Sequence, residues 1–333
     1  MEVMIINQAE VSALMPMKEC INVMADALKS LARGKDILPL RPVMWLPEKR
    51  GALGLMPAYC HDLKIMGVKV VSVFPDNAGT AYDSHQGTVL IYETEHGSLL
   101  AIVDAGEITA VRTAATSGVA TRLLASKDAR KLSILGSGIQ ARAHLDAMLA
   151  VRNIKKVSVW SRTAENARRF VEQAHHRHDV SINIADTVAA AVTKADIICT
   201  TTSAPEPVLL GKWISPGTHI NAVGSSVSFT RELDTAAMVN GRLFVDRRES
   251  TLNEAGDFLF PKKEGALGDD HILGEIGELL LGTATGRKSP TDITIFKSLG
   301  LAIEDVASAA YIYRQAKAKG AGTLVELGGL RHY

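Results

Sequence analysis

A glycine turn between an apolar strand pattern and a helical pattern constrains the fold more than any other feature. In "KLSILGSGIQARAHLDAML", a short apolar run leads into Gly136 and Gly138 and then into a helical pattern that includes Ala141. This G-x-G-x-x-A spacing permits a tight turn, a close approach of backbone to a pyrophosphate, and close packing of the helix on the strand. Backbone N–H groups at the helix start, at Ile139 and Gln140, are suited to an anion. The turn therefore predicts a dinucleotide-binding site.

The pattern around this turn predicts the fold class. From about Thr113 strand and helix patterns alternate, and the strand patterns read "KLSIL", "KVSVWS", "DVSINI", "DIICTTT", "THINAVG" and "RLFVD". Such alternation indicates βαβ units, and hence an α/β fold with a Rossmann doubly wound parallel sheet. We expect the region after Leu259 to be mainly helical, with one long helix in "SLGLAIEDVASAAYIYRQAKAKG" that returns to the first domain.

The first hundred residues have a different pattern. "MKECINVMADALKSLARG" places apolar residues at helical spacing and ends on Gly34, which is typical of a helix stop. Five short segments rich in Val, Ile and Leu follow: "RPVMWLP", "GALGLMPAY", "GVKVVSVFP", "GTVLIYE" and "SLLAIVD". We expect a predominantly β domain with a helix packed against it.

Composition excludes several classes of partner. The 333 residues are 47% hydrophobic and carry a net charge of +1, which suits two globular domains and gives no basic surface for nucleic acid or an anionic membrane. No apolar stretch has spanning length and no export signal is recognisable, so we expect a cytoplasmic protein. Three widely spaced cysteines predict neither a disulfide framework nor a metal site. Small molecules are the expected partners.

The end of the second strand of the alternating region indicates the dinucleotide. At the position where a carboxylate would bind the adenosine ribose, the chain has Ser161, followed by Arg162 and Thr163. A carboxylate would repel a 2′-phosphate, whereas Arg and hydroxyl groups bind one. NADP(H) is therefore favoured over NAD(H). NAD(H) stays open, because Arg162 also fits a solvated surface charge or a residue that stacks on adenine.

The order of several motifs adds a family resemblance. "LPLRPVM", "LGLMPAY", "GVKVVSVFPDN", "ITAVRTAATSGVATRLLA", "ILGSGIQARAH", "INAVGSS", "RELD" and "FKSLGLAIEDVASA" follow one another along the chain. Nearly end to end, the sequence resembles the ornithine cyclodeaminase/μ-crystallin family. The resemblance implies an α+β substrate-binding and dimerisation domain, formed by residues 1–115 and 309–333, and a Rossmann domain at 116–308. It also implies a homodimer and an imino or amino acid substrate.

The resemblance implies three cations that hold the substrate α-carboxylate. These are Arg41, Lys69 and Arg112, and a guanidinium grips a carboxylate by two bonds. Lys69 lies between "GV" and "VV", and Arg112 between "ITAV" and "TAAT". An unpaired charge in either apolar context would be costly, so the sequence favours functional roles for both. Arg41 also fits a charge on a surface strand.

Other site residues follow from the resemblance. Met56 is expected to line the substrate pocket, although methionine also suits a plain core. His85 is expected to contact substrate or donate a proton, although an isolated histidine in a turn is more often structural. The expected cofactor contacts are Thr113 and Ser298 near the nicotinamide and phosphates, and Val223 and Gly224 under the nicotinamide ring.

One departure from the family pattern bears on the reaction. Ornithine cyclodeaminases carry an aspartate two residues beyond Gly224, whereas this chain has Ser226. Serine is poorly suited to hold and deprotonate an ammonium group, so ornithine cyclodeamination is disfavoured. The resemblance then implies NAD(P)H-dependent reduction of Δ1-pyrroline-2-carboxylate or Δ1-piperideine-2-carboxylate to the cyclic L-amino acid. Lys69, Arg112 and Ser226 are its expected catalytic residues.

Several alternatives stay open at this point. Within the enzyme class they are an alanine or other amino-acid dehydrogenase, a reductase of an acyclic imine such as iminosuccinate, and a residual cyclodeaminase. Outside it, a non-catalytic protein that binds ligand together with NADPH remains. Ammonium dependence separates the dehydrogenase from the imine reductases, because a dehydrogenase that starts from a keto acid consumes free ammonium and a preformed cyclic imine does not.

Overall fold

The chain divides into two compact units. The computed structural model describes residues 1–77 and 79–329. Unit 1 contains Met1–Arg112 and the segment that begins at Leu301, and unit 2 is Thr113–Gly300. The expected boundaries were 115/116 and 308/309. The second lies earlier because all of helix α11 (Ala302–Lys319) belongs to unit 1.

Unit 1 is built on a seven-stranded sheet with the order β15-β1-β6-β5-β4-β3-β2. Strands β2 to β6 are antiparallel neighbours and confirm the five expected strands, while β1 pairs parallel with β6 and antiparallel with β15. The sequence analysis did not anticipate β1 or β15. The strands are β1 (Glu2–Ile6), β2 (Val43–Trp45), β3 (Ala52–Cys60), β4 (Ile65–Val73), β5 (His85–Glu93), β6 (Leu99–Asp104) and β15 (Thr323–Glu326).

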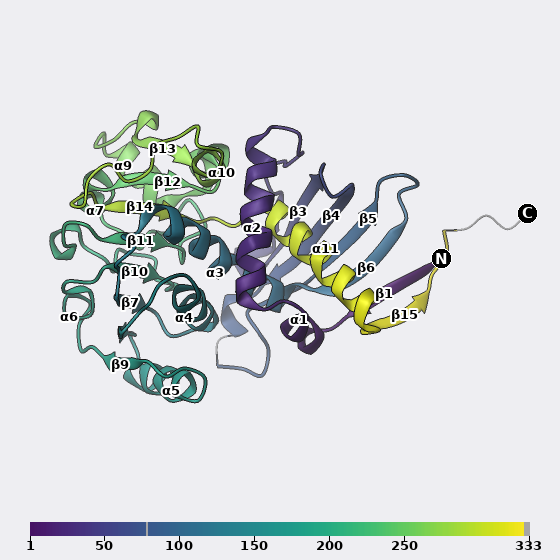
Figure 1. The fold of residues 1–333 in the computed structure, drawn as a ribbon, viewed down its shortest axis with the longest axis horizontal. Helices are drawn as coiled ribbons and strands as arrows, with labels where there is room; N and C mark the ends of the chain where they lie inside the picture. Colours follow the sequence, from purple (N-terminus) through teal and green to yellow (C-terminus); the bar gives the residue numbers. More distant parts are fainter. Residues whose placement is uncertain (78, 330–333) are drawn as a thin grey trace, which may run out of the picture. The chain divides into compact units, whose positions relative to one another are not determined.

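Helices cover one face of this sheet. The long helices α2 (Met17–Ala32) and α11 lie side by side over the strands, and α11 packs on β3, β4 and β5 (Figure 1). On α2 the buried side chains include Ile21, Met24 and Leu28, the spacing expected of an amphipathic helix. Gly34 follows with φ of +74°, a backbone conformation that favours glycine. The shorter elements of unit 1 are α1 (Gln8–Leu14) and two 3-10 turns, Pro47–Lys49 and Pro75–Asn77.

Unit 2 is the expected doubly wound domain. Its eight strands are all parallel, in the order β13-β12-β14-β11-β10-β7-β8-β9. From β7 the chain continues to β8 on one side and later to β10 on the other, so the carboxyl ends of β7 and β10 border the crevice where such sheets bind ligands. The strands are β7 (Lys131–Leu135), β8 (Lys156–Trp160), β9 (Ser181–Ile184), β10 (Ile197–Thr200), β11 (His219–Ala222), β12 (Arg242–Val245), β13 (Ile272–Glu275) and β14 (Thr294–Lys297).

The expectation of a mainly helical region after Leu259 was wrong in part. Strands β13 and β14 lie there, each of four residues, and β14 is buried throughout. A fully buried strand lacks the polar alternation that would distinguish it from a helical segment. The helices are α3 (Ala105–Leu124), which crosses the unit boundary, α4 (Ile139–Val151), α5 (Ala164–His175), α6 (Val188–Val192), α7 (Thr235–Asn240), α8 (Arg248–Glu254), α9 (Gly256–Lys263) and α10 (Ile276–Leu281), with 3-10 turns at Gly211–Trp213 and Asp269–His271.

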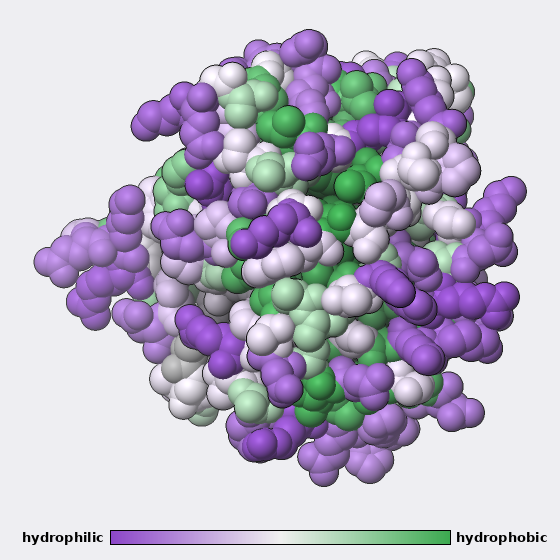
Figure 2. All heavy atoms as spheres, turned by 90° about the vertical axis from the view of Figure 1, so that its left-hand side faces the viewer, coloured by the Kyte–Doolittle hydropathy of each residue, from purple (hydrophilic) through white to green (hydrophobic). Residues whose placement is uncertain are grey.

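The core of unit 2 lies between its sheet and these helices. Leu135, Ile198, Ile220, Val245 and Ile295 come from five parallel strands and share one buried cluster. On the face seen in Figure 2, hydrophilic side chains project around the outline and hydrophobic residues lie in the recesses between them. None of the described helices combines the length and the apolar character that a membrane crossing requires.

Candidate functional site

Four charged side chains of unit 1 form one buried cluster. Lys69 comes from β4, Arg112 from α3, and Glu304 and Asp305 from the first turn of α11. Lys69 Nζ lies 2.8 Å from Asp305 Oδ2, Arg112 Nε donates to Asp305 Oδ1 over 2.9 Å, and Arg112 Nη1 donates to Glu304 Oε2 over 2.8 Å. All four side chains are at most 4% exposed. The structure therefore brings two of the three expected carboxylate-binding cations together.

Strand geometry explains how Lys69 reaches this position. It pairs with Met56 on β3 and with Val89 on β5, and both of these residues are buried. Residues directly opposite in an antiparallel pair share a face, so all three side chains face α11. Lys69 Nζ also donates to Thr109 Oγ1 over 3.3 Å. Met56 is thus a neighbour of Lys69 on the face of the sheet that α11 covers.

The cluster sets the pKa of Lys69 and the orientation of the Arg112 guanidinium. Loss of hydration lowers the pKa of Lys69 from 10.5 to about 8; Asp305 opposes this shift, and Arg112 adds to it. Arg112 donates hydrogen bonds from two nitrogens to two carboxylates, and these bonds fix the plane of its guanidinium. The two cations balance Glu304 and Asp305, whose place in the first turn of α11 suits the helix dipole. Such preoriented, dehydrated cations are well suited to bind a carboxylate.

The other expected substrate contacts have different surroundings. Arg41 is half-buried in the segment before β2, where Leu55 N donates to Pro42 O over 3.0 Å and joins that segment to β3. His85 begins β5 with an exposed side chain. Partial loss of hydration lowers the pKa of His85, and the positive charge of Lys69 lowers it further against the opposing effect of Asp83. His85 is therefore within electrostatic reach of the cluster.

The carboxylates of the cluster were missed by the sequence analysis. Glu304 and Asp305 stand in "LAIEDVASA", an otherwise apolar helix start. A charge in an apolar run requires a partner, and this holds for these two acids as it does for Lys69 and Arg112. That signal was available from the sequence.

The glycine turn of unit 2 has the shape that a dinucleotide requires. Gly136 has φ of +120°, and a Cβ atom there would lie 2.7 Å from Thr201 O, so a side chain is excluded. Gly138 is the N-cap of α4, and among the described residues no side chain caps it and no atom lies within 4 Å of a Cβ placed there. Ile139 is 52% exposed, whereas Ala141 is fully buried against the strand. The residues present fit the pyrophosphate of a dinucleotide.

The residues expected around the adenosine ribose lie at the end of β8. The hydroxyls of Ser161 and Ser137 are 2.9 Å apart and share a hydrogen bond, which links the β8 end to the glycine turn. Arg162 and Thr163 are exposed, and Thr163 is the N-cap residue of α5. Gln140 is half-buried in the first turn of α4. Its backbone carbonyl oxygen lies 2.8 Å from His144 Nδ1.

A third group of expected residues lies at the carboxyl ends of β11 and β14. The backbone N–H groups of Val223 and Gly224 donate to Thr200 O over 3.0 and 3.1 Å. A Cβ atom on Gly224 would lie 2.1 Å from Thr202 O, so this position also requires glycine. The remaining expected residues are Ser298, buried with no hydrogen-bond partner for its hydroxyl among the described residues, Thr113, also buried, and Ser226, half-buried.

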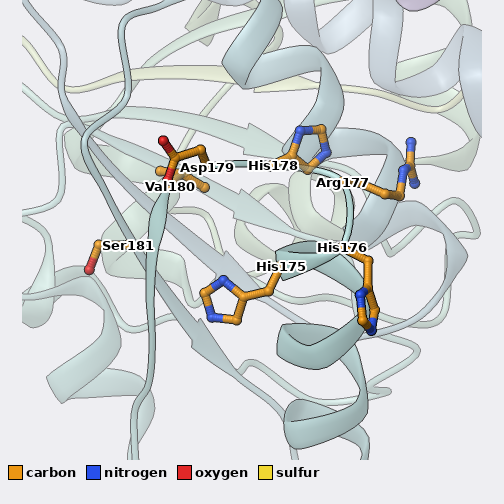
Figure 3. A pocket seen from close by; sticks show the side chains of 7 residues that line it. All are labelled: His175, His176, Arg177, His178, Asp179, Val180 and Ser181. Carbon is orange, nitrogen blue, oxygen red and sulfur yellow. The ribbon is translucent and has the colours of Figure 1, made fainter.

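An open hollow elsewhere on unit 2 is unrelated to these groups. It is lined by residues 175–181, which join the end of α5 to β9 (Figure 3). The rings of His175 and His176 point apart, and His178 Nε2 is engaged by Asp146 Oδ1 at 2.6 Å. No residue predicted to bind substrate or cofactor lines this hollow.

Comparisons with known proteins identify the family of the chain. Ketimine reductase mu-crystallin from Mus musculus is 40% identical over 290 residues, which cover 86% of this chain and 88% of the mouse protein. The structure of Thermococcus litoralis Δ1-pyrroline-2-carboxylate reductase in complex with NADH and L-proline matches with a TM-score of 0.94 and 38% identity, over 96% of this chain and 99% of that chain. An archaeal alanine dehydrogenase dimer with bound NAD matches with a TM-score of 0.92 and 31% identity, over 98% of this chain and 100% of that chain. The family model that matches residues 1–320 is that of the ornithine cyclodeaminase/mu-crystallin family, and the chain belongs to this family.

Proposed function

We propose that this protein is an NAD(P)H-dependent reductase of a cyclic imine that carries a carboxylate, Δ1-pyrroline-2-carboxylate or Δ1-piperideine-2-carboxylate. The observation that carries the proposal is the buried pair Lys69 and Arg112, held by Asp305. Two relatives support the substrate class, since one is named a ketimine reductase and the other a Δ1-pyrroline-2-carboxylate reductase. The product is the cyclic L-amino acid.

The residues of unit 1 bind and orient the imine. Arg112 presents a planar donor set and Lys69 a point charge, so together they fix the carboxylate and the adjacent imine carbon. Arg41 adds a third cation on the side of β3. The bound dinucleotide supplies the hydride. Fixing the acceptor carbon in one orientation lowers the entropic part of the barrier.

Proton balance requires one further proton at the imine nitrogen. The protonated imine is the better hydride acceptor, because its carbon is more electrophilic. Lys69 carries a transferable proton below pH of about 8, and the half-buried hydroxyl of Ser226 can accept a hydrogen bond from the protonated imine nitrogen. Ser226 brings no positive charge that would oppose the iminium.

We further propose that NADP(H) is preferred over NAD(H). The exposed Arg162 and the hydroxyls of Ser161 and Thr163 form a set of groups that suits a 2′-phosphate. The structures of two family members contain NADH or NAD, so the preference is a property of these three positions and not of the fold.

Replacing Ser161 by aspartate is expected to reverse this preference. The new carboxylate repels the 2′-phosphate and accepts bonds from the ribose hydroxyls, so kcat/KM for NADPH should fall about 100-fold, roughly the effect of 3 kcal/mol of lost binding. The measurement is kcat/KM for both cofactors with a saturating imine. Ser181→Asp, which adds the same charge at an exposed position of β9, is the control. An unchanged cofactor ratio in Ser161→Asp would remove this residue from the 2′-phosphate site.

Binding of a carboxylate is expected to weaken as the pH rises through 8. Lys69 is charged below its lowered pKa of about 8 and neutral above it, so its attraction for a carboxylate is lost at higher pH. Cyclopentene-1-carboxylate has no ring nitrogen that titrates, and its Kd with saturating NADP+ should rise by up to about tenfold per pH unit above 8. Lys69→Arg keeps its charge and should give a flat profile. A flat profile in the wild type would show that Lys69 does not contribute its charge.

We also propose a homodimer formed through the sheet of unit 1. Residues that alternate with the helix-facing Met56 and Lys69 point to the opposite face of the sheet, and among them Leu55 is 39% and Met66 40% exposed. Exposed apolar side chains on a sheet face indicate an interface. Sedimentation should give twice the mass of one chain, and Leu55→Glu should give one chain; a monomeric wild type would contradict the assignment.

Three free cysteines favour a reducing compartment. Cys20, Cys60 and Cys199 are free and buried, and we place the enzyme in the cytoplasm on this ground. Recovery of the protein in the cytoplasmic fraction of its native cells tests the placement, and recovery in the exported fraction would contradict it.

A further inference from the structure

A second buried charge network lies in unit 2, at the carboxyl ends of β10 and β11. The carboxylate of Glu232 is fully buried and accepts four hydrogen bonds. Its Oε1 accepts from Thr202 N over 2.6 Å and from Thr202 Oγ1 over 2.7 Å. Its Oε2 accepts from Thr200 Oγ1 over 2.6 Å and from Gly224 N over 2.7 Å. One side chain therefore ties together the ends of two neighbouring strands.

Lys297 and Asp257 support the same region from the side of β14. Lys297 Nζ donates to Ala222 O over 3.2 Å and to Ser225 O over 2.5 Å, and it lies 2.9 Å from Asp257 Oδ2. Asp257 Oδ1 in turn accepts from the backbone N–H of Glu232 over 2.8 Å. Glu232 thus holds the N–H of Gly224, and Lys297 holds the carbonyl of Ser225, in the segment that follows β11.

Burial and hydrogen bonding have opposite effects on the ionisation of Glu232. Burial raises the pKa of Glu232, the charge of Asp257 raises it further, and the bonds from Thr200 and Thr202 lower it. Each of its oxygens accepts from one backbone N–H, which can only donate, and from one threonine hydroxyl. Four hydrogen bonds to one carboxylate are a strong reason to keep the charge.

We infer that Glu232 is a positioning residue for the nicotinamide half of the cofactor site. The inference rests on the proposed function and on the family resemblance, which implies that Val223 and Gly224 lie under the nicotinamide ring. Gly224 is within hydrogen-bond distance of Glu232, and a Cβ atom on Gly224 would meet Glu232 Oε1 at 2.6 Å. This close contact with Glu232 fixes the position of the Gly224 backbone, on which the ring is proposed to lie.

The network is separate from the residues proposed to bind the adenosine half. Those are Ser161, Arg162 and Thr163 at the end of β8, whereas the four bonds to Glu232 come from the ends of β10 and β11. In the sheet, β7 separates β8 from β10. Disturbing Glu232 should therefore weaken binding of the whole dinucleotide and spare binding of its adenosine half.

Glu232→Gln tests this separation with almost no change in side-chain size. In either orientation the amide NH2 replaces an oxygen that accepts a backbone N–H, from Thr202 or from Gly224, and neither N–H can turn away. The probes are NADPH and 2′,5′-ADP, and the readout is the Kd of each by titration calorimetry. We expect Kd for NADPH to rise about tenfold or more, and Kd for 2′,5′-ADP to stay within about twofold.

Asp196→Asn is the control for Glu232→Gln, and Thr200→Val is a second variant that disturbs the same network. Asp196 also accepts backbone N–H groups, from Arg130 and Lys131, but at the amino-terminal edge of the sheet, so Asp196→Asn should leave both Kd values unchanged. Thr200→Val removes one of the four bonds without changing the Glu232 charge, and it should weaken NADPH binding by a smaller factor. This variant replaces Glu232→Gln if the latter does not fold.

The binding results separate failure of the positioning role of Glu232 from failure of the proposed function. Unchanged NADPH binding in Glu232→Gln, or an equal loss for both probes, would overturn the positioning role, the second because it indicates general support of unit 2. A wild-type protein that binds NADH but neither probe would contradict the proposed NADP(H) preference, and the same test is then made with NADH and 5′-AMP. A wild-type protein that binds neither NADPH nor NADH would contradict the proposed function itself and the inference with it. Wild-type binding of both probes with a selective loss in the variant supports both.

Discussion

Replacing Lys69 by methionine is expected to lower kcat/KM for the cyclic imine by about 100-fold or more. Methionine retains the length of the side chain but removes a buried charge that binds the substrate carboxylate, and loss of such a partner costs roughly 2–5 kcal/mol. Arg112 continues to pair with Glu304 and Asp305, so the fold should persist. The measurement is the steady-state rate against imine concentration at saturating NADPH.

The control for this prediction is Lys29→Met. Lys29 lies on α2 in the same unit and pairs with Asp26 at the surface, where charge contributes little. We expect Lys29→Met to match the wild type, and both variants to keep the wild-type Kd for NADPH. A near-normal kcat/KM in Lys69→Met would remove Lys69 from the mechanism.

Replacing Arg112 by leucine is expected to have the largest effect on stability. Arg112 bonds both Glu304 and Asp305, and its removal leaves two buried carboxylates with only Lys69 to compensate them. Breaking a buried pair from one side costs about 3–5 kcal/mol. The measurement is the denaturant midpoint, followed by a spectroscopic probe in unit 1.

Arg33→Leu is the matched control. Arg33 pairs with Asp62 at the surface of the same unit, and both side chains are about half exposed at 53% and 52%. Its loss should change the free energy of unfolding by about 0–1 kcal/mol. Equal stability losses in the two variants would mean that the buried ion pairs of Arg112 contribute no more to the stability of unit 1 than a surface ion pair does.

The fold of unit 2 followed from local sequence features. Gly136 is required by its positive φ, and Gly138 leaves the start of α4 open; both are visible in the sequence as glycines after an apolar run. Strands β13 and β14 gave no such signal, because each has only four residues, and so short a segment does not distinguish the period of a strand from that of a helix. The edge strand β15 pairs with β1 across almost the whole chain, which no local pattern encodes.

Only the cationic side of the site was predicted from the sequence. Lys69 and Arg112 were recognised because a charge in an apolar run requires a partner. Their partners were not recognised, since Arg112 and Asp305 are 193 residues apart and meet only through the packing of α11 in unit 1. Glu232 was missed for a similar reason, because "RELD" reads as an exposed charged turn until the fold buries it.

The decisive measurement is the initial rate of NADPH oxidation with Δ1-piperideine-2-carboxylate in buffer free of ammonium. We expect rapid oxidation by the wild type, formation of the cyclic L-amino acid, and a rate at least about 100-fold lower in Lys69→Met at subsaturating imine. Oxidation that requires a keto acid and ammonium, or no oxidation with either cyclic imine, would contradict it.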